Sequence, residues 1–502
     1  MDQWIMSSNL TEAQSLSGAG VCCFALLSLL GDKVVFPGSG GYISSVSSYW
    51  AQQQAHIQPL CIVTPSSAED VSVAVRSLTS TAESLADPQE ASACDFAIRS
   101  GGHLPLAGAA NIAGGVVLDL RLLNSIEVSP DQGTALIGVG ATWGEVYAML
   151  EPLGLSVAGG RVADVGVGGL VTGGGISFFS PRYGWTCDTV SSYQVVLADG
   201  SIVKVNADEN SDLWWALRGG SNNFGAVTAV SMDTFDLGKI WGGSVYYSLS
   251  TIDKHLEAFA EINSPDAYNE YASLITSFGF AAGHGAAIVN AIEYTKAEEN
   301  PAVFAPLMEI PAMRSTMRLD SITNIAIEQG SFSRKGMRQL FVTVTHTSTL
   351  PILKSIYTHW NKSLAAIDTV PGIVWSISLE PLPPAIYARA AGSRPNALGL
   401  DQRSSALVVT LLSATWAEAA DDERVEQAGR DMMAAIERDA KEMGAYDPFV
   451  YLNYAARWQD PIASYGEEVV RRMQEVRDRV DPKRVFSHQV PGGFKIPSAM
   501  KE

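Results

Sequence analysis

The sequence predicts a mixed α and β protein that is built in at least two parts. Its 502 residues exceed what a single hydrophobic core usually holds. Up to about residue 236, short apolar strands alternate with helical patterns and with loops rich in glycine. From about 240 to 440, longer strand-like runs alternate with helices, which indicates a separate α+β unit.

The first part begins with an apolar run at 21–30, which is too short to span a membrane and predicts an amphipathic or buried helix. Residues 42–58 mix polar and aromatic side chains and predict an irregular segment. A strand at 61–63 precedes a cap and an acidic first turn at 66–70, an order typical of a β–α unit. The pattern further predicts strands at 95–98, 115–120, 134–141 and 226–235, helices at 142–150 and 212–217, and a hairpin at 191–206.

The second part shows longer strands and longer helices. We expect strands at 244–249, 286–294, 340–345, 374–379 and 406–412, and helices at 252–262 and 423–443. After residue 447 the chain becomes aromatic again, and a helix at 466–480 closes it.

The net charge of the chain limits the kinds of partner that we expect. With 34 basic and 53 acidic residues the chain carries a net charge of −19, so a nucleic-acid partner is not expected. We recognise no membrane span and no clear N-terminal signal, which favours an intracellular location without deciding it.

The five cysteines form no C-x-x-C pair and no cluster with histidine, so no metal site is expected. We expect most of them to be buried free thiols. The alternative is a single disulfide that joins either Cys22 or Cys23 to Cys61.

A glycine-rich loop follows the strand at 95–98 and reads Arg-Ser-Gly-Gly-His over residues 99–103. Small residues after a buried strand expose backbone N–H groups, which phosphates favour, and His103 adds a nucleophilic ring at the loop's edge. A second glycine cluster covers residues 165–175, but Val171 breaks the dinucleotide spacing G-x-G-x-x-G and no P-loop is present. On spacing alone, the two clusters are either tight structural turns or a clamp for a pyrophosphate.

The two clusters belong to a longer, ordered series of motifs. The series consists of residues 62–65, 99–103, 166–175, 183–188, 197–200, 212–220, 223–228 and 451–454. Together they resemble the flavoprotein oxidases of the berberine-bridge-enzyme-like family, within the vanillyl-alcohol-oxidase/PCMH flavin-binding superfamily, and most closely those of fungal secondary metabolism. The resemblance implies an α+β fold with a PCMH-type FAD-binding domain at 1–238 (core 57–237). It also implies a central substrate-binding α+β domain at 239–444 and a segment at 445–502 that returns to the first domain.

The resemblance implies FAD as the cofactor, bonded covalently through His103. The loops at 99–102 and 166–175 would hold the pyrophosphate and the flavin edge, and Ala226 and Val227 would lie beside the adenine end. The expected cofactor-binding residues are Arg99, Ser100, Gly101, Gly102, His103, Gly166, Gly168, Gly169, Thr172, Gly173, Gly174, Ala226, Val227, Tyr451, Asn453 and Tyr454.

The chain departs from the family at one place. Many relatives carry a second attachment through a cysteine before the glycine cluster, where this chain has Val162. Valine forms no thioether, so the resemblance implies a single covalent bond. Gly160 resembles the small residue that leaves room for dioxygen at the flavin in oxidases of the family.

Two side chains are candidates for acid and base chemistry. Tyr454 is expected near the flavin, although a tyrosine is by default a packed aromatic residue, and its hydroxyl needs a partner to act as a base. Glu380, at the end of a predicted strand, is either a second catalytic group or a surface carboxylate.

The resulting hypothesis is an FAD-dependent oxidase that takes a hydride from a small organic substrate, a secondary-metabolite intermediate, with O2 as electron acceptor. One alternative is a redox-neutral isomerase or cyclase that uses the same pocket. Another is a flavin-binding protein without catalysis. The substrate, the oligomeric state and the general base are not defined by the sequence.

Overall fold

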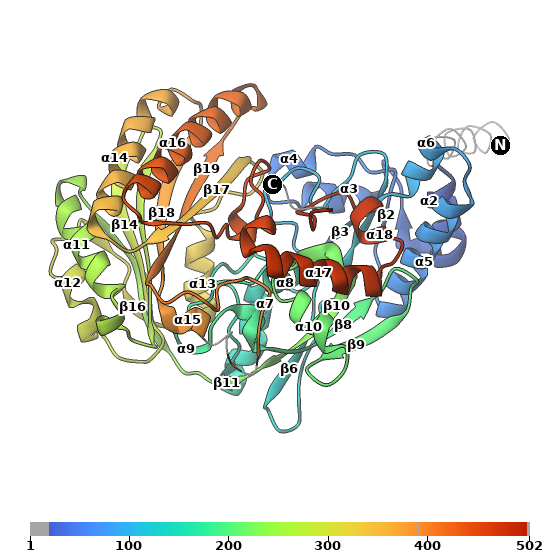
Figure 1. Ribbon diagram of the computed structural model, residues 1–502, viewed down its shortest axis with the longest axis horizontal. Helices are drawn as coiled ribbons and strands as arrows, with labels where there is room; N and C mark the ends of the chain where they lie inside the picture. Colours follow the sequence, from blue (N-terminus) through green and yellow to red (C-terminus); the bar gives the residue numbers. More distant parts are fainter. Residues whose placement is uncertain (1–19, 389–391, 393, 499–502) are drawn as a thin grey trace, which may run out of the picture.

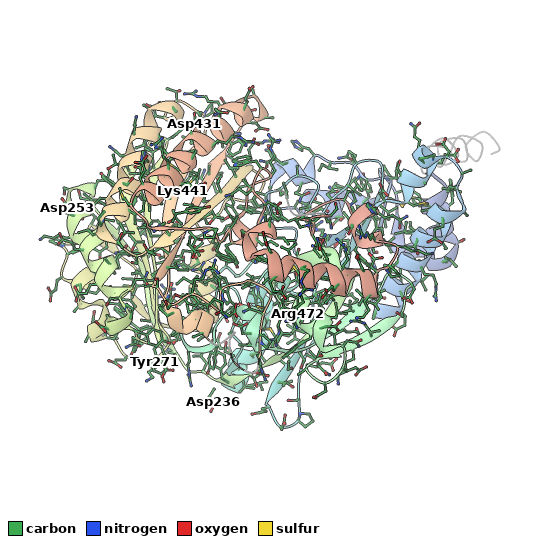
Figure 2. All side chains as sticks on the ribbon, viewed as in Figure 1. Asp236, Asp253, Tyr271, Asp431, Lys441 and Arg472 are labelled. Carbon is green, nitrogen blue, oxygen red and sulfur yellow. A yellow bond between two sulfur atoms is a disulfide. The ribbon has the colours of Figure 1, made fainter. Side chains whose placement is uncertain are left out.

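The computed structural model describes residues 20–388, 392 and 394–498, which fold into two lobes that lie side by side (Figure 1). The first lobe contains a four-stranded sheet, a five-stranded sheet and a two-stranded pair. The second lobe is built on one nine-stranded sheet. Charged side chains such as Asp253 and Asp431 lie on the outer helices of the second lobe (Figure 2). In the described part of the chain, no helix is both long and apolar enough to cross a membrane.

The four-stranded sheet places the first glycine-rich loop at its edge. Its strand order is β1-β2-β4-β3, and β4 pairs in parallel with both β2 and β3. Parallel strands end at the same edge of a sheet, where open α/β folds bind their ligands. The loop after β3 therefore starts at a favoured position for a ligand. The bounds are β1 Val34–Val35, β2 Cys61–Val63, β3 Phe96–Arg99 and β4 Val116–Asp119, with helix α5 Ala68–Ser84 between β2 and β3.

The five-stranded sheet is antiparallel, with the order β5-β6-β10-β8-β9. Its strands are β5 Ile126–Val128, β6 Thr134–Gly138, β8 Val190–Val196, β9 Ile202–Asn206 and β10 Ala226–Asp233. Helix α7 (Trp143–Leu150) begins at a capping box in which Thr142 and Glu145 satisfy each other's backbone N–H groups. Helix α10 (Ser211–Ala216) buries Trp214 and Trp215, as expected.

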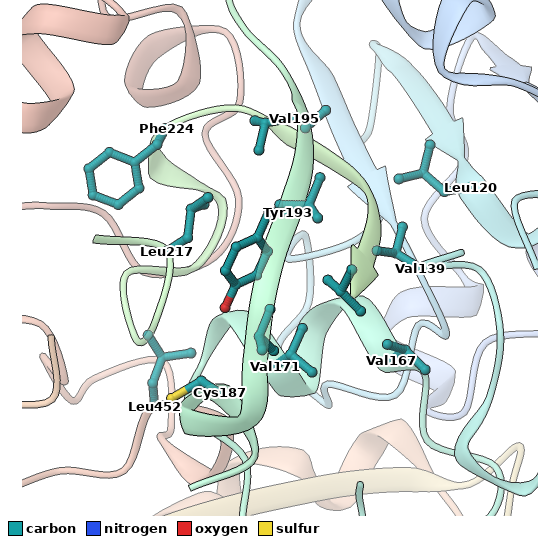
Figure 3. Close-up of a cluster of buried hydrophobic side chains, with 14 of the residues drawn as sticks. Leu120, Val139, Val167, Val171, Cys187, Tyr193, Val195, Leu217, Phe224 and Leu452 are labelled. Carbon is teal, nitrogen blue, oxygen red and sulfur yellow. The ribbon is translucent and has the colours of Figure 1, made fainter. Parts of the chain in front are cut away.

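The second glycine cluster contains a short helix, α8 (Val167–Thr172), where the sequence predicted a loop. Its apolar side chains Val167 and Val171 point into the buried cluster around Tyr193 of β8 (Figure 3). Buried valines on one face leave the glycines of the other face free to line a cavity. Packing of the two buried valines, and not the glycines, therefore stabilises helix α8.

The sheet of the second lobe has one face covered by helices and one face turned toward the first lobe (Figure 1). The period of two is visible in β18 (Val374–Leu382), where Trp375, Ile377 and Leu379 are fully buried between partly exposed neighbours. The other strands are β12 Ile240–Tyr247, β13 Ala272–Ala281, β14 Gly285–Tyr294, β15 Arg314–Ser315, β16 Arg318–Asp320, β17 Arg338–Thr347, β19 Leu407–Trp416 and β20 Tyr446–Asp447. The helices are α11 Ile252–Ile262, α12 Ala305–Met308, α13 Ile322–Gly330, α14 Leu350–Ile367 and α16 Asp422–Glu442.

The end of the chain returns to the first lobe. Helix α17 (Glu467–Val480) lies on it, drawn in red in Figure 1, and Arg479 pairs with Asp212 of α10 at 2.6 Å. The buried residues of α17 belong to the hydrophobic cluster of the first lobe. A separate cluster fills the second lobe. The domain limits given above remain predictions.

Several predicted elements differ from the observed ones. Residues 42–58 contain the helices α3 (Gly40–Ser47) and α4 (Gln52–Ala55) instead of an irregular segment. Strand β13 and helix α14 had no predicted counterpart. Glycine and alanine weaken the strand pattern of β13, and the Leu-Pro start of α14 weakens the helical one.

The cysteines form two disulfides, which corrects the expectation of mostly free thiols. Cys23 pairs with Cys61, one of the two forms considered, and Cys22 pairs with Cys94, which was not foreseen. Cys187 is free and buried. Both bonds tie helix α2 (Gly20–Leu30) to the four-stranded sheet region. Disulfides persist in oxidising compartments, so these bonds lend no support to an intracellular location.

Removing the Cys22–Cys94 bond by a double change to alanine is expected to lower the free energy of unfolding by about 2–4 kcal/mol, because the bond closes a long loop in the unfolded chain. The sequence separation it spans is 72 residues. Denaturant unfolding with and without reductant measures the loss. Cys187→Ala is the matched control and should stay as sensitive to reductant as the wild type. An unchanged midpoint in the double variant would contradict the pairing.

Candidate active site

A cavity of about 760 Å³ lies between the two lobes and receives residues from both. This volume is within the range of roughly 300–1,000 Å³ that is usual for small-molecule and cofactor sites. The predicted site residues that line it are Ser100, Gly101, Gly102, His103, Gly166, Gly168, Gly169, Thr172, Val227, Glu380, Tyr451, Asn453 and Tyr454. The structure therefore brings together residues that are hundreds of positions apart in the sequence.

Four predicted cofactor residues do not line the cavity. Gly173 packs against Asn453, where an added Cβ would lie 2.2 Å from the amide oxygen. Gly174 faces Leu398 and Trp185, and Ala226 is fully buried in β10. These three are packing positions, and the fourth is Arg99.

Arg99 supports the loop from beneath. Its guanidinium donates to the backbone oxygen of Ser45 and to the hydroxyl of Ser48, both at 2.7 Å, and stacks on the ring of Tyr49. Asp119 balances its charge at 3.7 Å. Arg99 is fully buried, and its side chain fixes the loop to helix α3.

The two glycine clusters touch each other through their backbones. A Cβ added to Gly101 would lie 2.6 Å from the nitrogen of Gly166, so only glycine allows this approach. The hydroxyl of Ser100 donates to the oxygen of Val139 at 2.6 Å and accepts from the N–H of Gly168 at 3.1 Å. The two clusters together form one continuous wall of the cavity, the glycine wall, which contains Gly101, Gly102, Gly166, Gly168 and Gly169.

Gly101→Ala is expected to push the two clusters apart and to destabilise the first lobe by about 1–3 kcal/mol, as overpacking usually does. Gly169→Ala is the matched control, because a Cβ there meets no heavy atom within 4 Å. Thermal unfolding of both cofactor-free proteins measures the difference. Equal melting temperatures for the two variants would show that the close approach is not needed.

His103 stands at the end of the glycine wall. Burial lowers its pKa to about 4, so the ring is unprotonated near neutral pH. An unprotonated imidazole has a free lone pair and is a nucleophile.

The cavity is also lined by a compact group of three polar side chains. Arg161 donates to Oε2 of Glu380 and to the hydroxyl oxygen of Tyr454, both at 2.7 Å. The hydroxyl of Tyr454 donates to Oε1 of Glu380 at 3.0 Å. Glu380 is 3% exposed, which decides against a surface carboxylate.

The protonation of this group follows from its burial. Burial raises the pKa of Tyr454 well above its usual value, in spite of the nearby Arg161 cation. Burial, the largest single influence, lowers the pKa of Arg161, but Glu380, Tyr454 and Tyr451 together raise it above its usual value. The phenol is therefore protonated and the guanidinium charged, and a proton that reaches Tyr454 can continue to Glu380.

Tyr451 and Asn453 attach the returning segment to helix α8. The hydroxyl of Tyr451 accepts from the N–H of Gly175 at 3.1 Å. The amide of Asn453 donates to the oxygen of Leu170 at 3.3 Å. Their contacts position the short helix Leu452–Tyr454, and with it the Tyr454 ring.

Sequence reasoning missed Arg161. The only signal was a single arginine in an apolar, glycine-containing stretch next to the second glycine cluster. Its neighbour Val162 also lines the cavity. Gly160 faces Trp143 and Leu170, where a Cβ would collide, and does not line the cavity. The expected role of Gly160 in leaving room for dioxygen is thus not supported by its position.

The sheet of the second lobe covers the cavity with hydroxyl groups. Ser277 of β13 lies opposite Ser378 of β18, and their hydroxyls are 2.7 Å apart. Ser376 lies opposite Ser413 of β19. Hydroxyls that face a cavity at strand centres can bind oxygen atoms of a ligand.

The residues present fit FAD. The glycine wall presents backbone without Cβ atoms, as close approach of a pyrophosphate requires, and Asn222 and Val227 also line the cavity. His103 and Tyr454 line the same cavity.

Sequence comparison supports the cofactor. A family model described as an FAD binding domain matches residues 59–206. A FAD-dependent monooxygenase from Cercospora beticola is 35% identical over 496 residues, which cover 96% of this chain and 93% of that relative. An oligopeptidase from Diaporthe leptostromiformis is 42% identical over 469 residues. That alignment covers 93% of this chain and 36% of that relative, so the chain spans about a third of its length.

Solved structures show the same fold. 6-Hydroxy-D-nicotine oxidase from Arthrobacter nicotinovorans superposes with a TM-score of 0.74 at 23% identity, over 93% of this chain and 98% of that one. BBE-like 1 from Physcomitrella patens gives 0.74 at 17% identity, over 96% and 99%. The fold and the cavity define an FAD-linked oxidoreductase of PCMH type. The chain belongs to the family of the fungal FAD-dependent monooxygenases, and its fold is that of the solved BBE-like proteins.

Proposed function

We propose that the protein is an oxidase that removes a hydride from a small organic molecule, with O2 as the final electron acceptor and FAD bonded through His103. The observation that carries the proposal is that the glycine wall, His103 and the Arg161–Glu380–Tyr454 group all line one cavity. When bound, FAD accepts a hydride from an activated C–H bond and passes the electrons to O2.

The polar group supplies the proton transfer that accompanies such an oxidation. A substrate hydroxyl or amine that approaches Tyr454 gives its proton to the phenol oxygen while the phenol proton moves to Glu380. The Tyr454 hydroxyl already points at Oε1 of Glu380. Arg161 holds the Tyr454 hydroxyl and the Glu380 carboxylate in place through hydrogen bonds, and it balances the charge of that carboxylate. The base is thus Glu380, and Tyr454 is the relay.

The walls of the cavity favour a substrate with both a ring system and oxygen atoms. Phe280, Phe332 and Phe341 line it together with the hydroxyls of the second-lobe sheet. Aromatic walls bind the faces of flat molecules, and hydroxyls bind their oxygen atoms. A hydroxylated aromatic intermediate of secondary metabolism fits this lining.

The redox-neutral isomerase or cyclase is a second candidate, because the same relay could move protons without net oxidation. The relative from Cercospora beticola is named a monooxygenase, so insertion of an oxygen atom into the substrate is a third candidate reaction. The three reactions differ in the fate of the electrons and of O2.

Anaerobic mixing of the purified holoprotein with a panel of hydroxylated aromatic compounds, with oligosaccharides for comparison, tests the proposal. An oxidase loses the visible absorption of its flavin, regains it in air and forms hydrogen peroxide in step with product. Product without bleaching would establish the redox-neutral reaction, and label from ¹⁸O2 in the product would establish oxygen insertion. Colourless protein without FAD would contradict all three.

A further inference from the structure

The ring of His103 is covered on one face by Trp50. The two ring centroids lie 4.2 Å apart and the planes are inclined by 8°, a parallel stack. Trp50 is 6% exposed and is not part of the cavity wall, so it stands behind the imidazole. Its backbone N–H donates to the oxygen of Gly102 at 3.3 Å, which joins the tryptophan to the loop itself.

Trp50 is held by residues of both lobes. The N–H of Gly336 donates to the backbone oxygen of Trp50 at 2.8 Å. The indole also packs against Phe341 of β17 at 5.4 Å, and Phe341 packs against Tyr454 at 5.8 Å. Trp50 is therefore fixed in position, and the imidazole that lies against it can rotate little.

Among the described residues, no charged side chain shifts the pKa of His103. Trp50, which stacks on the ring, is uncharged, and the guanidinium of Arg99 donates to Ser45 and Ser48 and lies beside Asp119. Among the described residues, the influences on the pKa of His103 are burial, which dominates and lowers it, and a backbone hydrogen bond. The indole of Trp50 covers one face of the ring and so contributes to this burial.

We propose that Trp50 is a positioning residue for covalent flavin attachment: it fixes the plane of His103 and keeps its lone pair free. The inference rests on the proposed bond between His103 and FAD. In that step an imidazole nitrogen bonds to the carbon of the flavin's 8-methyl group. One C–H and one N–H proton leave, and the flavin itself takes up the electron pair. O2 then reoxidises the flavin and becomes hydrogen peroxide.

The experiment compares Trp50→Leu, which removes the aromatic face, with Trp50→Phe, which keeps a ring. Trp215→Phe is the matched control, because Trp215 is 4% exposed in the same lobe, stacks on Arg472 and does not line the cavity. Protein from riboflavin-depleted cells is incubated with FAD in air. Covalent flavin is read as in-gel fluorescence and as the intact mass of the denatured chain, and total flavin as absorption before denaturation.

Trp50→Leu should bind FAD but attach it about 10- to 100-fold more slowly, the size of effect expected from a misplaced reacting group. Trp50→Phe should regain most of the rate, and Trp215→Phe should match the wild type. Wild-type rates in both Trp50 variants would overturn the proposal. If Trp50→Leu does not fold, a wild-type rate for Trp50→Phe at every pH of the profile described next would overturn it. Covalent flavin absent from the wild type itself would overturn the His103 bond as well, which separates the two failures.

The pH profile distinguishes positioning from a general loss of stability. The wild-type attachment rate should stay level from pH 8 down to about pH 5.5, because the pKa of His103 is about 4. Both Trp50 variants admit more water to the ring and raise its pKa toward the usual value of about 6.5. Protonation removes the lone pair, so their rates should fall as the pH drops through that value. A level profile in Trp50→Leu and in Trp50→Phe would overturn the assignment of the pKa to the indole.

Discussion

Glu380→Gln is expected to slow reduction of the flavin by about 100- to 10,000-fold, the usual contribution of a positioned proton acceptor. The glutamine amide keeps the size of the side chain and can still meet Arg161, but it cannot take the proton that Tyr454 passes on. Stopped-flow recording of flavin bleaching without oxygen, with any substrate that bleaches the wild type, measures the rate. The FAD content should not change.

Glu293→Gln is the matched control for this prediction. Glu293 is also a buried glutamate near Arg161, and burial raises its pKa to about 8. Its Oε1 accepts a hydrogen bond from the amide of Gln329 at 3.3 Å, and the residue does not line the cavity. Its variant should bleach at a rate close to that of the wild type. Equal losses in the two variants would mean that the relay through Tyr454 is not the path of the proton.

Arg161→Met has the largest expected effect on stability. It leaves the buried carboxylate of Glu380 without its cation, and such a loss usually costs about 3–5 kcal/mol. The free energy of unfolding from guanidinium titration should fall by this amount. Methionine is unbranched and fills most of the vacated space, so loss of packing contributes little.

The double variant Arg161→Met with Glu380→Gln tests the cause. Removing both charges abolishes the uncompensated carboxylate, so the double variant should be more stable than Arg161→Met alone. Contacting residues show such coupling, whereas independent sites add. Strict additivity of the two single losses would contradict a charge-based explanation.

Much of the first lobe was predictable because its signals are local. The cap at residues 66–70 and the hairpin at 191–206 each act over a few residues, and the helix and the strands appear there as expected. The helices within 42–58 and within the second glycine cluster, which lack such signals, were not predicted. The series of motifs also placed His103 and Tyr454 in one site. Their common cavity is the observation that supports this placement.

The rest of the site depends on contacts that no local pattern contains. Arg161 and Tyr454 are separated by 293 positions, and only the packed fold brings them to 2.7 Å. The pairing of Cys22 with Cys94 depends likewise on where helix α2 is placed. Glycine in a sequence does not say whether it lines a cavity or packs inside, as Gly169 and Gly174 do respectively.

The return of the chain to its first lobe has a consequence for synthesis. A ribosome releases the strands of the four-stranded sheet early, and domains fold as they emerge. Tyr451, Asn453 and Tyr454, however, come from the segment that is made after the whole second lobe. The cofactor site is therefore complete only after residue 454 has been made, and a chain interrupted before residue 451 would fold its early sheets but lack one wall of the site. Tightly held flavin would then mark those copies that were translated past residue 454.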